Sequence, residues 1–590
     1  MIYDTEGMLD HLKFLYGAEA AGEILENLLN IISSYKPRIP SPKSPSATLD
    51  QRTITEEDAV LITYGDMVTD PGKPPLQVLG DLLVRYLQDM VSTIHLLPFY
   101  PYSSDDGFAI IDYKAVNPAL GSWEDVGRIG RHFRLMFDAV INHMSAESNW
   151  FQAYLSGEPG YSNFFISVNE ESDFSSVFRP RDLPLFTPVQ SKTGPKLVWT
   201  TFSSDQIDLN YANPKVLLAI VDTLLWYAVK GAEFIRLDAI AYLWKEEGTS
   251  SINLPQTHRI IQILRMVLDM AAPHIAIITE TNVPHEQNIS YFGDGYNEAQ
   301  LVYNFSLPPL VLHAFQSGDA SKLSNWASRL ETPSDQSYFF NFLASHDGIG
   351  LRPALGILNE KEIDKMAQKV EELGGSVSYR ANPDGSKSPY ELNINYLDAL
   401  SDFEDPNYDL RLISSRFLTS QAIMLAIQGV PGIYFHSIFG SRGWIEGVKK
   451  TGLARTINRQ KLNVEDLRSE LAEAGSLRSY VYQGYRKLMK VRRSWETFHP
   501  SAGQSIKMVH PSLFTCLRTS IDGTKKFVGI HNVSRCTIQT HLNSSELESD
   551  LSNGVLDLLN GRWVDISRDG DITVSLPPYG TLWLGLSRED

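Results

Sequence analysis

Four short apolar segments of the chain each end in side chains that can do acid, base or nucleophilic chemistry. Three carboxylates, an arginine and two histidines on one face suit glycosyl transfer, in which one carboxylate attacks the anomeric carbon and a second protonates the leaving oxygen. A third carboxylate can hold sugar hydroxyls. Any one such group alone is more often a solvated loop acid or a structural histidine, so the inference depends on all four ends together. The segments are DAVINH with Asp138, Asn142 and His143, FIRLDAI with Arg236 and Asp238, IITETN with Glu280, and FLASHD with His346 and Asp347.

These groups can act together only if the segments that carry them end on one face of the fold. Eight short apolar or β-branched runs occur along the chain, and amphipathic segments lie between several of them. Strands that alternate with helices indicate parallel strands, and eight of them predict an α/β protein with a (β/α)₈ TIM barrel. Active sites in such barrels lie where strands end and loops begin. The eight runs are 59–65, 92–100, 134–142, 232–240, 275–281, 301–305, 339–346 and 432–437, and helices are expected at 75–90, 214–230 and 258–272.

The rest of the chain predicts additions to this barrel. Residues 1–56 combine helical periodicity with a Pro- and Ser-rich linker, which indicates a short helical N-terminal segment. Residues 57–502 form the expected catalytic barrel, with an inserted subdomain after the third strand at about 143–210. A turn-rich stretch at about 347–415 is typical of an ordered loop over a site. Short alternating segments in 503–590 predict a C-terminal all-β domain.

The charge balance excludes several classes of partner. The 52 Lys and Arg residues against 70 Asp and Glu residues give a net charge of −18, which leaves no basic footprint for nucleic acid or anionic lipid. No apolar run approaches the roughly 18 residues that span a bilayer, and the N-terminus carries acids where a signal peptide carries Lys or Arg. The only two cysteines, Cys516 and Cys536, fit a reducing compartment and are expected to be buried apolar residues. We therefore expect a cytoplasmic protein.

No motif indicates a cofactor or a metal. The chain has no GxGxxG that opens a helix after a strand, no P-loop and no cluster of Cys and His for zinc. We therefore expect small-molecule substrates as partners, and neither cofactor nor metal.

The same segments carry a resemblance to a known family. DAVINH, GAEFIRLDAI, ITET and LASHD resemble, in the same order, four sequence blocks of the α-amylase superfamily of retaining glycosidases and transglycosidases, and QIDLN resembles a fifth. Over about residues 59–500 the chain looks like the sucrose phosphorylase branch, whose short members lack a segment like the helical one before residue 56. The length of 590 residues, that helical segment and SPYELNINY are more similar to the glucosylglycerate phosphorylases of this branch. The segments that resemble the branch are 95–113, 178–186, 236–250, 304–315 and 454–460.

The resemblance implies a role for each of the three carboxylates. Asp238 would be the nucleophile that forms a β-glucosyl-enzyme, Glu280 the acid/base and Asp347 the transition-state stabiliser. Arg236 projects to the same side of its strand as Asp238, so we expect it to keep that carboxylate ionised while Glu280 starts protonated. Retention requires the two carboxyl groups to lie about 5–5.5 Å apart.

The resemblance also implies a glucose pocket that is closed at one end. His143 and His346 would bind glucose hydroxyls, Asp105 and Arg455 would close the non-reducing end, and Phe108 would lie beneath the ring. Phe108 as plain core and Arg455 as a surface ion-pair partner are the alternatives. The nearby Arg459 is expected to be structural.

The acceptor side is where the members of the branch differ. Phosphate would contact Arg181 and Tyr390, because the arginine fork engages phosphate oxygens bidentately. The alternative for Arg181 is a stabilising ion pair. Glu391 stands where the sucrose phosphorylases have a glutamine that helps to hold fructose, so we expect a change of charge at the acceptor. Tyr242 and Phe202 match positions near the acceptor, although aromatic residues beside a barrel strand are as often packing.

These matches predict a phosphorylase that produces α-glucose 1-phosphate. Glucosylglycerate is the expected donor, followed by sucrose, and then by glucosylglycerol and phosphorylated sucrose. An anionic glycerate needs a cation, for which Arg181, Lys192 and Lys196 are the nearest candidates in the sequence. Two alternatives remain: a hydrolase or transglucosidase that uses the same carboxylates, or a non-catalytic barrel. The resemblance to the branch also implies a homodimer.

Overall fold

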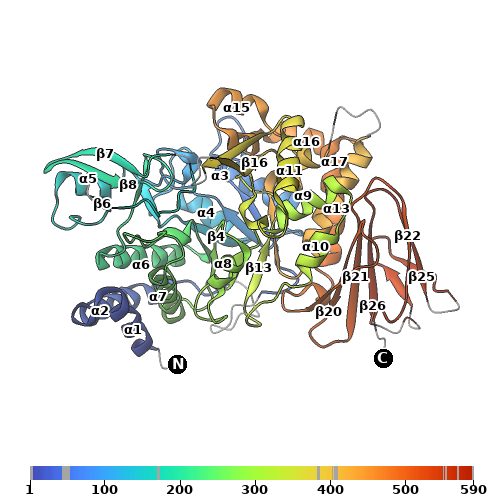
Figure 1. Ribbon diagram of the computed structural model, residues 1–590, viewed down its shortest axis with the longest axis horizontal. Coiled ribbons are helices and arrows are strands. Elements are labelled where there is room, and N and C mark those ends of the chain that lie inside the picture. Colours follow the sequence, from blue (N-terminus) through green and yellow to red (C-terminus); the bar gives the residue numbers. More distant parts are fainter. Residues whose placement is uncertain are drawn as a thin grey trace.

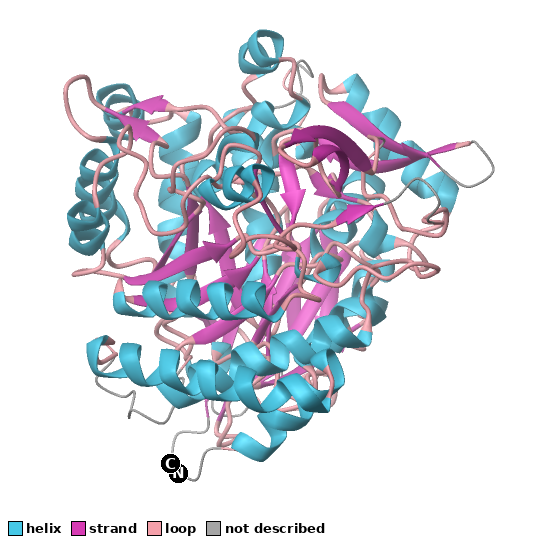
Figure 2. Ribbon diagram, turned by 90° about the vertical axis from the view of Figure 1, so that its left-hand side faces the viewer, coloured by secondary structure: helices cyan, strands magenta, loops and turns pink. Residues whose placement is uncertain are grey.

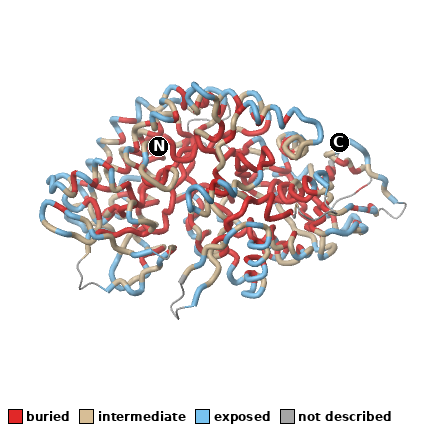
Figure 3. Tube along the Cα trace, turned by 90° about the horizontal axis from the view of Figure 1, so that it is seen from above, coloured by how far each residue is buried: buried red, intermediate tan, exposed pale blue. Residues whose placement is uncertain are grey.

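Eight parallel strands close into a barrel at the centre of the molecule, and helices surround them (Figures 1 and 2). The strand order around the barrel is β1-β17-β13-β12-β11-β10-β4-β3, so the predicted TIM barrel is confirmed. Buried residues lie in the interior of the molecule, while exposed residues follow its outer surface (Figure 3). The computed structural model describes residues 4–42, 54–168, 173–181, 183–381, 386–401, 403, 409–548, 551, 554–567 and 571–587.

Each barrel strand overlaps one of the eight predicted runs. The strands are buried on both faces, and they consist mainly of branched and aromatic residues, which is why each reads as an apolar run rather than an alternating one. β13 and β17 begin one and two residues earlier than predicted. The strands are β1 (Val60–Thr63), β3 (Thr93–Leu96), β4 (Arg134–Ala139), β10 (Ala232–Leu237), β11 (Ala276–Thr279), β12 (Leu301–Tyr303), β13 (Tyr338–Asn341) and β17 (Val430–Tyr434).

The connections between the barrel strands are mainly helical. Proline at the first helical position begins α6 and α7, where its missing N–H costs nothing. The helices are α3 (Pro75–Leu87), α4 (Trp123–Ile129), α6 (Pro214–Val229), α7 (Pro255–Ala271), α8 (His285–Ile289), α9 (Leu307–Ser317), α10 (Ser321–Ala327), α13 (Leu410–Ala426), α14 (Phe435–Ile438), α15 (Ile445–Thr451), α16 (Val464–Ala472) and α17 (Leu477–Arg492). A two-stranded parallel sheet, β2 (Val68–Thr69) with β18 (Leu462–Asn463), joins two of the connections.

The N-terminal segment is a helical hairpin, α1 (Thr5–Tyr16) and α2 (Ala18–Tyr35), that packs on α6 and α7 (Figure 1). Tyr35 donates a hydrogen bond to Asp222 on α6 at 2.7 Å, and Tyr16 donates one to the carbonyl of Tyr211 at 3.1 Å. The packing of the hairpin explains why α6 is apolar on almost every side, since the barrel covers one face of this helix and the hairpin covers another. Part of the predicted linker, residues 43–53, lies outside the described residues.

Two further groups of elements lie over the strand ends. The first follows β4 within the predicted insertion and comprises β5 (His143–Ser145), α5 (Asn149–Ser156), β6 (Ser167–Val168), β7 (Phe186–Ser191), β8 (Gly194–Trp199) and β9 (Gln206–Asp208). The second was expected to be a loop but is more regular, with a sheet in the order β14-β16-β15 and two helices. Its elements are β14 (Ile349–Gly350), α11 (Glu360–Glu372), β15 (Ser376–Ala381), β16 (Lys387–Asn393) and α12 (Tyr396–Leu400).

The C-terminal part consists of antiparallel sheets with a core of their own, packed beside the barrel (Figure 1). Cys516 is buried as expected, but Cys536 is exposed in the turn after β21, so that part of the prediction is wrong. The six-stranded sheet contains β19 (Gly503–Lys507), β20 (Leu513–Thr519), β21 (Lys525–Asn532), β26 (Thr581–Ser587), β23 (Val555–Asp557) and β24 (Arg562–Val564), and the two-stranded sheet contains β22 (Ile538–Leu542) and β25 (Ile572–Leu576). Among the described helices, none combines the length and apolar character needed to cross a bilayer.

Candidate active site

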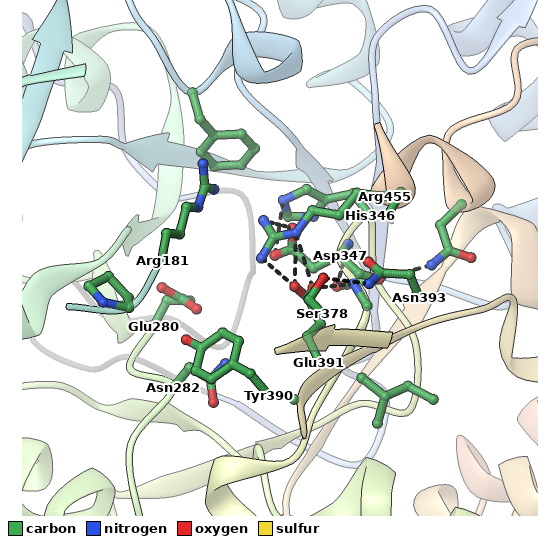
Figure 4. Close-up of a pocket in the computed structure, with 18 of the residues that line it drawn as sticks. Arg181, Glu280, Asn282, His346, Asp347, Ser378, Tyr390, Glu391, Asn393 and Arg455 are labelled. Carbon is green, nitrogen blue, oxygen red and sulfur yellow. Dashed lines mark hydrogen bonds and ion pairs between the residues drawn. The ribbon is translucent and has the colours of Figure 1, made fainter. Parts of the chain in front are cut away.

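A cavity of about 420 Å³ lies at the carboxyl ends of the barrel strands (Figure 4). Every residue predicted for the site lines it except Arg236, which is buried beside Asp238. The predicted residues that line it are Asp105, Phe108, His143, Arg181, Phe202, Asp238, Tyr242, Glu280, His346, Asp347, Tyr390, Glu391 and Arg455. The structure adds several polar residues that sequence reasoning left out or left without a role in the site, including Gln206, Asn282, Asn393, Asn458 and Arg459.

Asp238 is held by Arg236 from the same strand. Arg236 Nη1 lies 2.7 Å from Asp238 Oδ1, and the same nitrogen also pairs with Asp138. The register of β4 against β10 places Asp138 directly beside Arg236, and His95 Nε2 holds the second Asp138 oxygen at 2.6 Å. This chain of contacts fixes the arginine so that its charge faces Asp238. Asp138 therefore has a positioning role that the sequence pattern did not assign.

Glu280 is oriented by the backbone that follows Asp238. The Ala239 amide donates a hydrogen bond of 3.0 Å to Glu280 Oε2. Ala239 has a φ of +51°, a left-handed conformation that costs an L-residue on the order of 1–3 kcal/mol. The sharp turn thus aims both Asp238 and a hydrogen-bond donor for Glu280 into the same space.

Asp347 is surrounded by two arginines and a histidine. Arg455 Nη1 lies 2.6 Å from Asp347 Oδ1, Arg459 Nη2 lies 3.4 Å from the same oxygen, and His346 Nε2 lies 3.4 Å from Oδ2. Burial alone would raise the pKa of Asp347, but Arg455, His346 and Arg459 hold it below its usual range. Arg459 was expected to be structural. It also pairs with Asp106 at 2.5 Å and lines the cavity, so it belongs to the site.

Two stacked rings form an apolar wall of the cavity. Phe108 and His346 lie parallel with their centroids 4.9 Å apart, and burial lowers the pKa of His346 to about 3, which keeps the imidazole neutral. His143 differs from expectation, because both of its ring nitrogens already have protein partners. Nε2 lies 2.9 Å from the Phe108 carbonyl and Nδ1 lies 3.2 Å from Asn142 Nδ2. Binding of a sugar hydroxyl by His143 remains a prediction.

The two carboxyls at the centre of the site are electrostatically coupled. Burial raises the pKa of Glu280, as expected of a group that starts protonated. Burial also raises the pKa of Asp238 and outweighs the opposing effect of Arg236, which differs from the expectation that the arginine alone keeps this group ionised. Two such carboxyls share one proton more readily than they lose both. Of these two carboxyls, Asp238 accepts a hydrogen bond from Arg236 and Glu280 does not, so the shared proton is favoured on Glu280.

Comparisons with known proteins show the family to which the chain belongs. The Alpha-amylase family, described as "Alpha amylase, catalytic domain", matches residues 81–367. The glucosylglycerate phosphorylase of Spirochaeta thermophila is 47% identical over 98% of each chain, and that of Escherichia coli is 43% identical over 98% of this chain and 99% of its own. The chain belongs to this family of glycoside phosphorylases. The sucrose phosphorylase of Agrobacterium vitis is more distant, at 29% identity over 75% of this chain and 88% of its own.

The fold comparison agrees with the family assignment. The crystal structure of sucrose 6F-phosphate phosphorylase from Thermoanaerobacter thermosaccharolyticum superposes with a TM-score of 0.71 and covers 89% of this chain and 99% of its own, at 22% identity. At that identity the likeness concerns the fold. The likeness supports a TIM barrel that carries the additional segments described above.

In this phosphorylase, Asp105 and Arg455 both line the cavity, and their closing of the non-reducing end stays a prediction. Asp105 pairs with Arg181 at 3.3 Å and accepts a bond from Gln206 at 3.2 Å. Arg455 pairs instead with Asp347 and with Glu391, whose Oε1 lies 3.0 Å from Arg455 Nε. Arg181 thus lines the cavity and also has an ion-pair partner, Asp105, within it.

The acceptor side differs from expectation at Glu391. Its carboxylate accepts a bond of 2.7 Å from the Gly348 amide and is neutralised by Arg455 (Figure 4). It therefore braces the segment after Asp347 and does not add a free negative charge at the acceptor. Lys192 and Lys196 do not line the cavity, and Lys196 Nζ lies 4.3 Å from the ring centroid of Tyr154 on α5, so the structure gives no support to the prediction that they could assist glycerate.

A group of buried polar contacts lies next to His143 and supports the part of the phosphorylase site that carries it. Lys245 Nζ lies 2.6 Å from Asp208 Oδ2 and 2.8 Å from Asn142 Oδ1, and all three side chains are buried. Thr201 donates two further hydrogen bonds to Asp208, from its amide at 2.9 Å and from its hydroxyl at 2.7 Å. Burial lowers the pKa of Lys245, and Asp208 opposes that shift. The Lys245 ammonium group thus joins the segment before β5, the strand β9 and the segment after β10.

The variant Lys245→Met is expected to destabilise the protein by about 3–5 kcal/mol, because it leaves the Asp208 carboxylate buried without its partner. Thermal and denaturant unfolding measure this. Adding Asp208→Asn to the same chain should recover part of the loss, since no unpaired charge then remains. Lys73→Met is the matched control, because its ion pair with Asp70 lies on the surface and should leave the midpoint unchanged. Equal unfolding midpoints for Lys245→Met and Lys73→Met would show that the buried contact of Lys245 with Asp208 stabilises the fold no more than a surface ion pair does.

Proposed function

We propose that the protein is a retaining glycoside phosphorylase that converts 2-O-α-glucosyl-D-glycerate and phosphate into α-glucose 1-phosphate and D-glycerate. The observation that carries this proposal is the full-length similarity, at 43–47% identity, to proteins named glucosylglycerate phosphorylase. The presence of Asp238, Glu280 and Asp347 in one cavity supports a catalytic protein over a non-catalytic barrel.

In the first step, an Asp238 carboxylate oxygen attacks the anomeric carbon of the donor. The bond from that carbon to the glycerate oxygen breaks, and Glu280 gives its proton to this oxygen, so D-glycerate leaves as an alcohol. Asp347, ionised beside two arginines, faces the positive charge that develops on the sugar. The product of the step is a β-glucosyl ester of Asp238.

In the second step, a phosphate oxygen attacks the same carbon from the face that glycerate left. The ester bond to Asp238 breaks, and Glu280, now a carboxylate, accepts the proton from the phosphate hydroxyl. Two inversions give net retention, so the product is α-glucose 1-phosphate. The separation of about 5–5.5 Å between the two carboxyl groups stays a prediction of this mechanism.

Phosphate is proposed to bind between Arg181 and Tyr390. Both line the cavity, and the Arg181 side chain is about one-third exposed, which leaves it free to exchange Asp105 for an anion. A guanidinium suits this role because it engages two phosphate oxygens at once.

We further propose a cytoplasmic location and a homodimer. The first is supported by two thiols that form no disulfide, and the second by the resemblance to the sucrose phosphorylase branch. Size-exclusion chromatography with light scattering tests the dimer.

Phosphate release from α-glucose 1-phosphate tests the proposed activity. The reaction is run with D-glycerate, fructose, glycerol or no acceptor. D-Glycerate should accelerate release most, because the reverse reaction needs that acceptor to capture the glucosyl-enzyme. Acceleration by fructose or glycerol instead would assign the protein to the sucrose or glucosylglycerol phosphorylases. Slow and equal release in every tube would contradict phosphorylase chemistry and favour a hydrolase, to be sought with glucoside donors.

A further inference from the structure

Arg352 comes shortly after the cavity-lining residues Ile349 and Gly350 but does not itself line the cavity, and sequence reasoning assigned it no role. It begins the short 3-10 helix Arg352–Ala354, two residues after Gly350, which lines the cavity. The Leu351 amide donates a hydrogen bond of 3.0 Å to the carbonyl of Tyr390, so the backbone before Arg352 is fixed to β16. Its position is therefore set by the same sheet that places Tyr390 and Glu391 in the cavity.

Arg352 differs from the arginines that line the cavity because it has no carboxylate partner among the described residues. Arg181, Arg455 and Arg459 each pair with at least one aspartate. The guanidinium of Arg352 instead lies over the ring of Phe178, with its carbon 4.0 Å from the ring centroid. Within the described part of the chain, no carboxylate lies within ion-pair distance of it, and its buried Nη1 has no hydrogen-bond partner. A buried donor of this kind without an acceptor is costly, which indicates a ligand.

Two tyrosines connect the surroundings of Arg352 with those of Glu280. Tyr242 and Tyr390 each act electrostatically on both Arg352 and Glu280, so both tyrosines lie near the arginine as well as near the acid/base. Figure 4 shows Tyr390 and Asn282 together near Glu280, away from the side where Arg455 and Asp347 meet. Arg352 thus shares two neighbours with the acid/base, which protonates the leaving group in the proposed mechanism.

Asn282 provides a second unsatisfied group in the same place. Its Oδ1 is buried and has no hydrogen-bond partner among the described residues, although the residue lines the cavity. A Cβ on Gly350 would lie 2.9 Å from Asn282 Nδ2, so glycine at this position leaves the amide room. The close approach of Gly350 thus places Asn282 next to the segment that carries Arg352.

We propose that Arg352 and Asn282 form the subsite for the glycerate part of the donor. The guanidinium binds the carboxylate of glycerate, and Asn282 Oδ1 accepts a hydrogen bond from a glycerate hydroxyl. This inference rests on the proposed function and names the residues that select an anionic acceptor. The chemistry fits, because a carboxylate can satisfy several donors of one guanidinium at once, and a neutral acceptor such as glycerol would leave the charge unpaired.

The test compares Arg352→Met, Arg352→Lys and wild type in two assays. In the first, α-glucose 1-phosphate is the donor and D-glycerate the acceptor. Removal of the guanidinium should raise the KM for D-glycerate about 10- to 100-fold, the loss expected for hydrogen bonds to a charged group, while Arg352→Lys should recover part of it. Asn282→Ala should raise the same KM by a smaller factor, since one neutral bond is lost.

The second assay follows exchange of labelled inorganic phosphate into α-glucose 1-phosphate without any acceptor. It requires the glucosyl-enzyme and the phosphate site but not glycerate, so Arg352→Met should exchange at the wild-type rate. The matched control is Arg128→Met, which removes a positive charge from the surface of α4 at a position that does not line the cavity, and it should leave both assays unchanged.

The outcomes separate this inference from the proposed function. If wild type exchanges phosphate but does not use D-glycerate, both the proposed donor and the glycerate subsite are wrong. If wild type uses D-glycerate and Arg352→Met retains its KM, the subsite alone is wrong. A loss of phosphate exchange equal to the loss with D-glycerate would also overturn it, because Arg352 would then act on phosphate or on the fold.

Discussion

Asp238→Asn should lower the rate of glucosyl transfer on the order of 10⁴-fold or more, with phosphate exchange and transfer to D-glycerate reduced together. The amide retains an oxygen that can accept the bond from Arg236 Nη1, so the geometry of the site is preserved. It has no charge with which to attack the anomeric carbon. Both half-reactions pass through the ester of Asp238, and neither can proceed without it. Initial rates of exchange of labelled phosphate into α-glucose 1-phosphate measure the loss.

A matched Asp→Asn variant distinguishes lost chemistry from lost structure. Asp222 on α6 is a partly exposed carboxylate that bonds to Tyr35 of the N-terminal hairpin, far from the cavity lining. Asp222→Asn should retain exchange, and both variants should keep the wild-type circular dichroism. Residual exchange of more than a few per cent in purified Asp238→Asn would contradict the covalent mechanism and would require a different nucleophile.

The barrel was predictable because its strands are buried on both faces. A strand such as β4 or β10 reads as an apolar run, and the polar group at its end marks the edge of the site. The start of β17 was missed because Pro431 lies within it, and proline lacks the donor that a central strand normally uses. In the structure, Pro431 lies beside Asn341 at the beginning of the strand, where the ladder tolerates it. The second covering sheet was missed because turn residues interrupt its short strands.

The choice of partners among charged side chains could not be predicted. Asp138, Asp238 and Arg236 were all visible at strand ends, but only the register of β4 against β10 joins them. Glu391 resembled an acceptor residue because of its neighbour in the sequence, and it became a brace for Arg455 through a contact across 64 residues. Such pairs depend on how separate connections pack over one barrel. Arg352 could have been noticed as a cation close after the strand-end acid Asp347.

Glu280→Gln should lower the rate of phosphorolysis of glucosylglycerate about 10²- to 10⁴-fold, because glutamine has no proton to give to the departing glycerate oxygen. Phosphate is a better leaving group than an alcohol and needs less protonation, so phosphate exchange should fall by a smaller factor. The ratio of the two losses, measured on one preparation, is the decisive quantity. Glu286→Gln on α8, an exposed position near the end of the same strand, is the matched control and should change neither rate.

The pH profile gives an independent readout of the same residue. Burial raises the pKa of Glu280, so its protonated form persists to higher pH than that of an ordinary glutamate. Breakdown of the donor requires that form, and kcat/KM for phosphorolysis should therefore fall as the pH rises through this pKa. Glutamine does not titrate, so Glu280→Gln should lose this alkaline limb, whereas Glu286→Gln should keep it. A variant that lost activity equally with both substrates and kept the limb would show that Glu280 orients the substrate, and that the proton comes from another group.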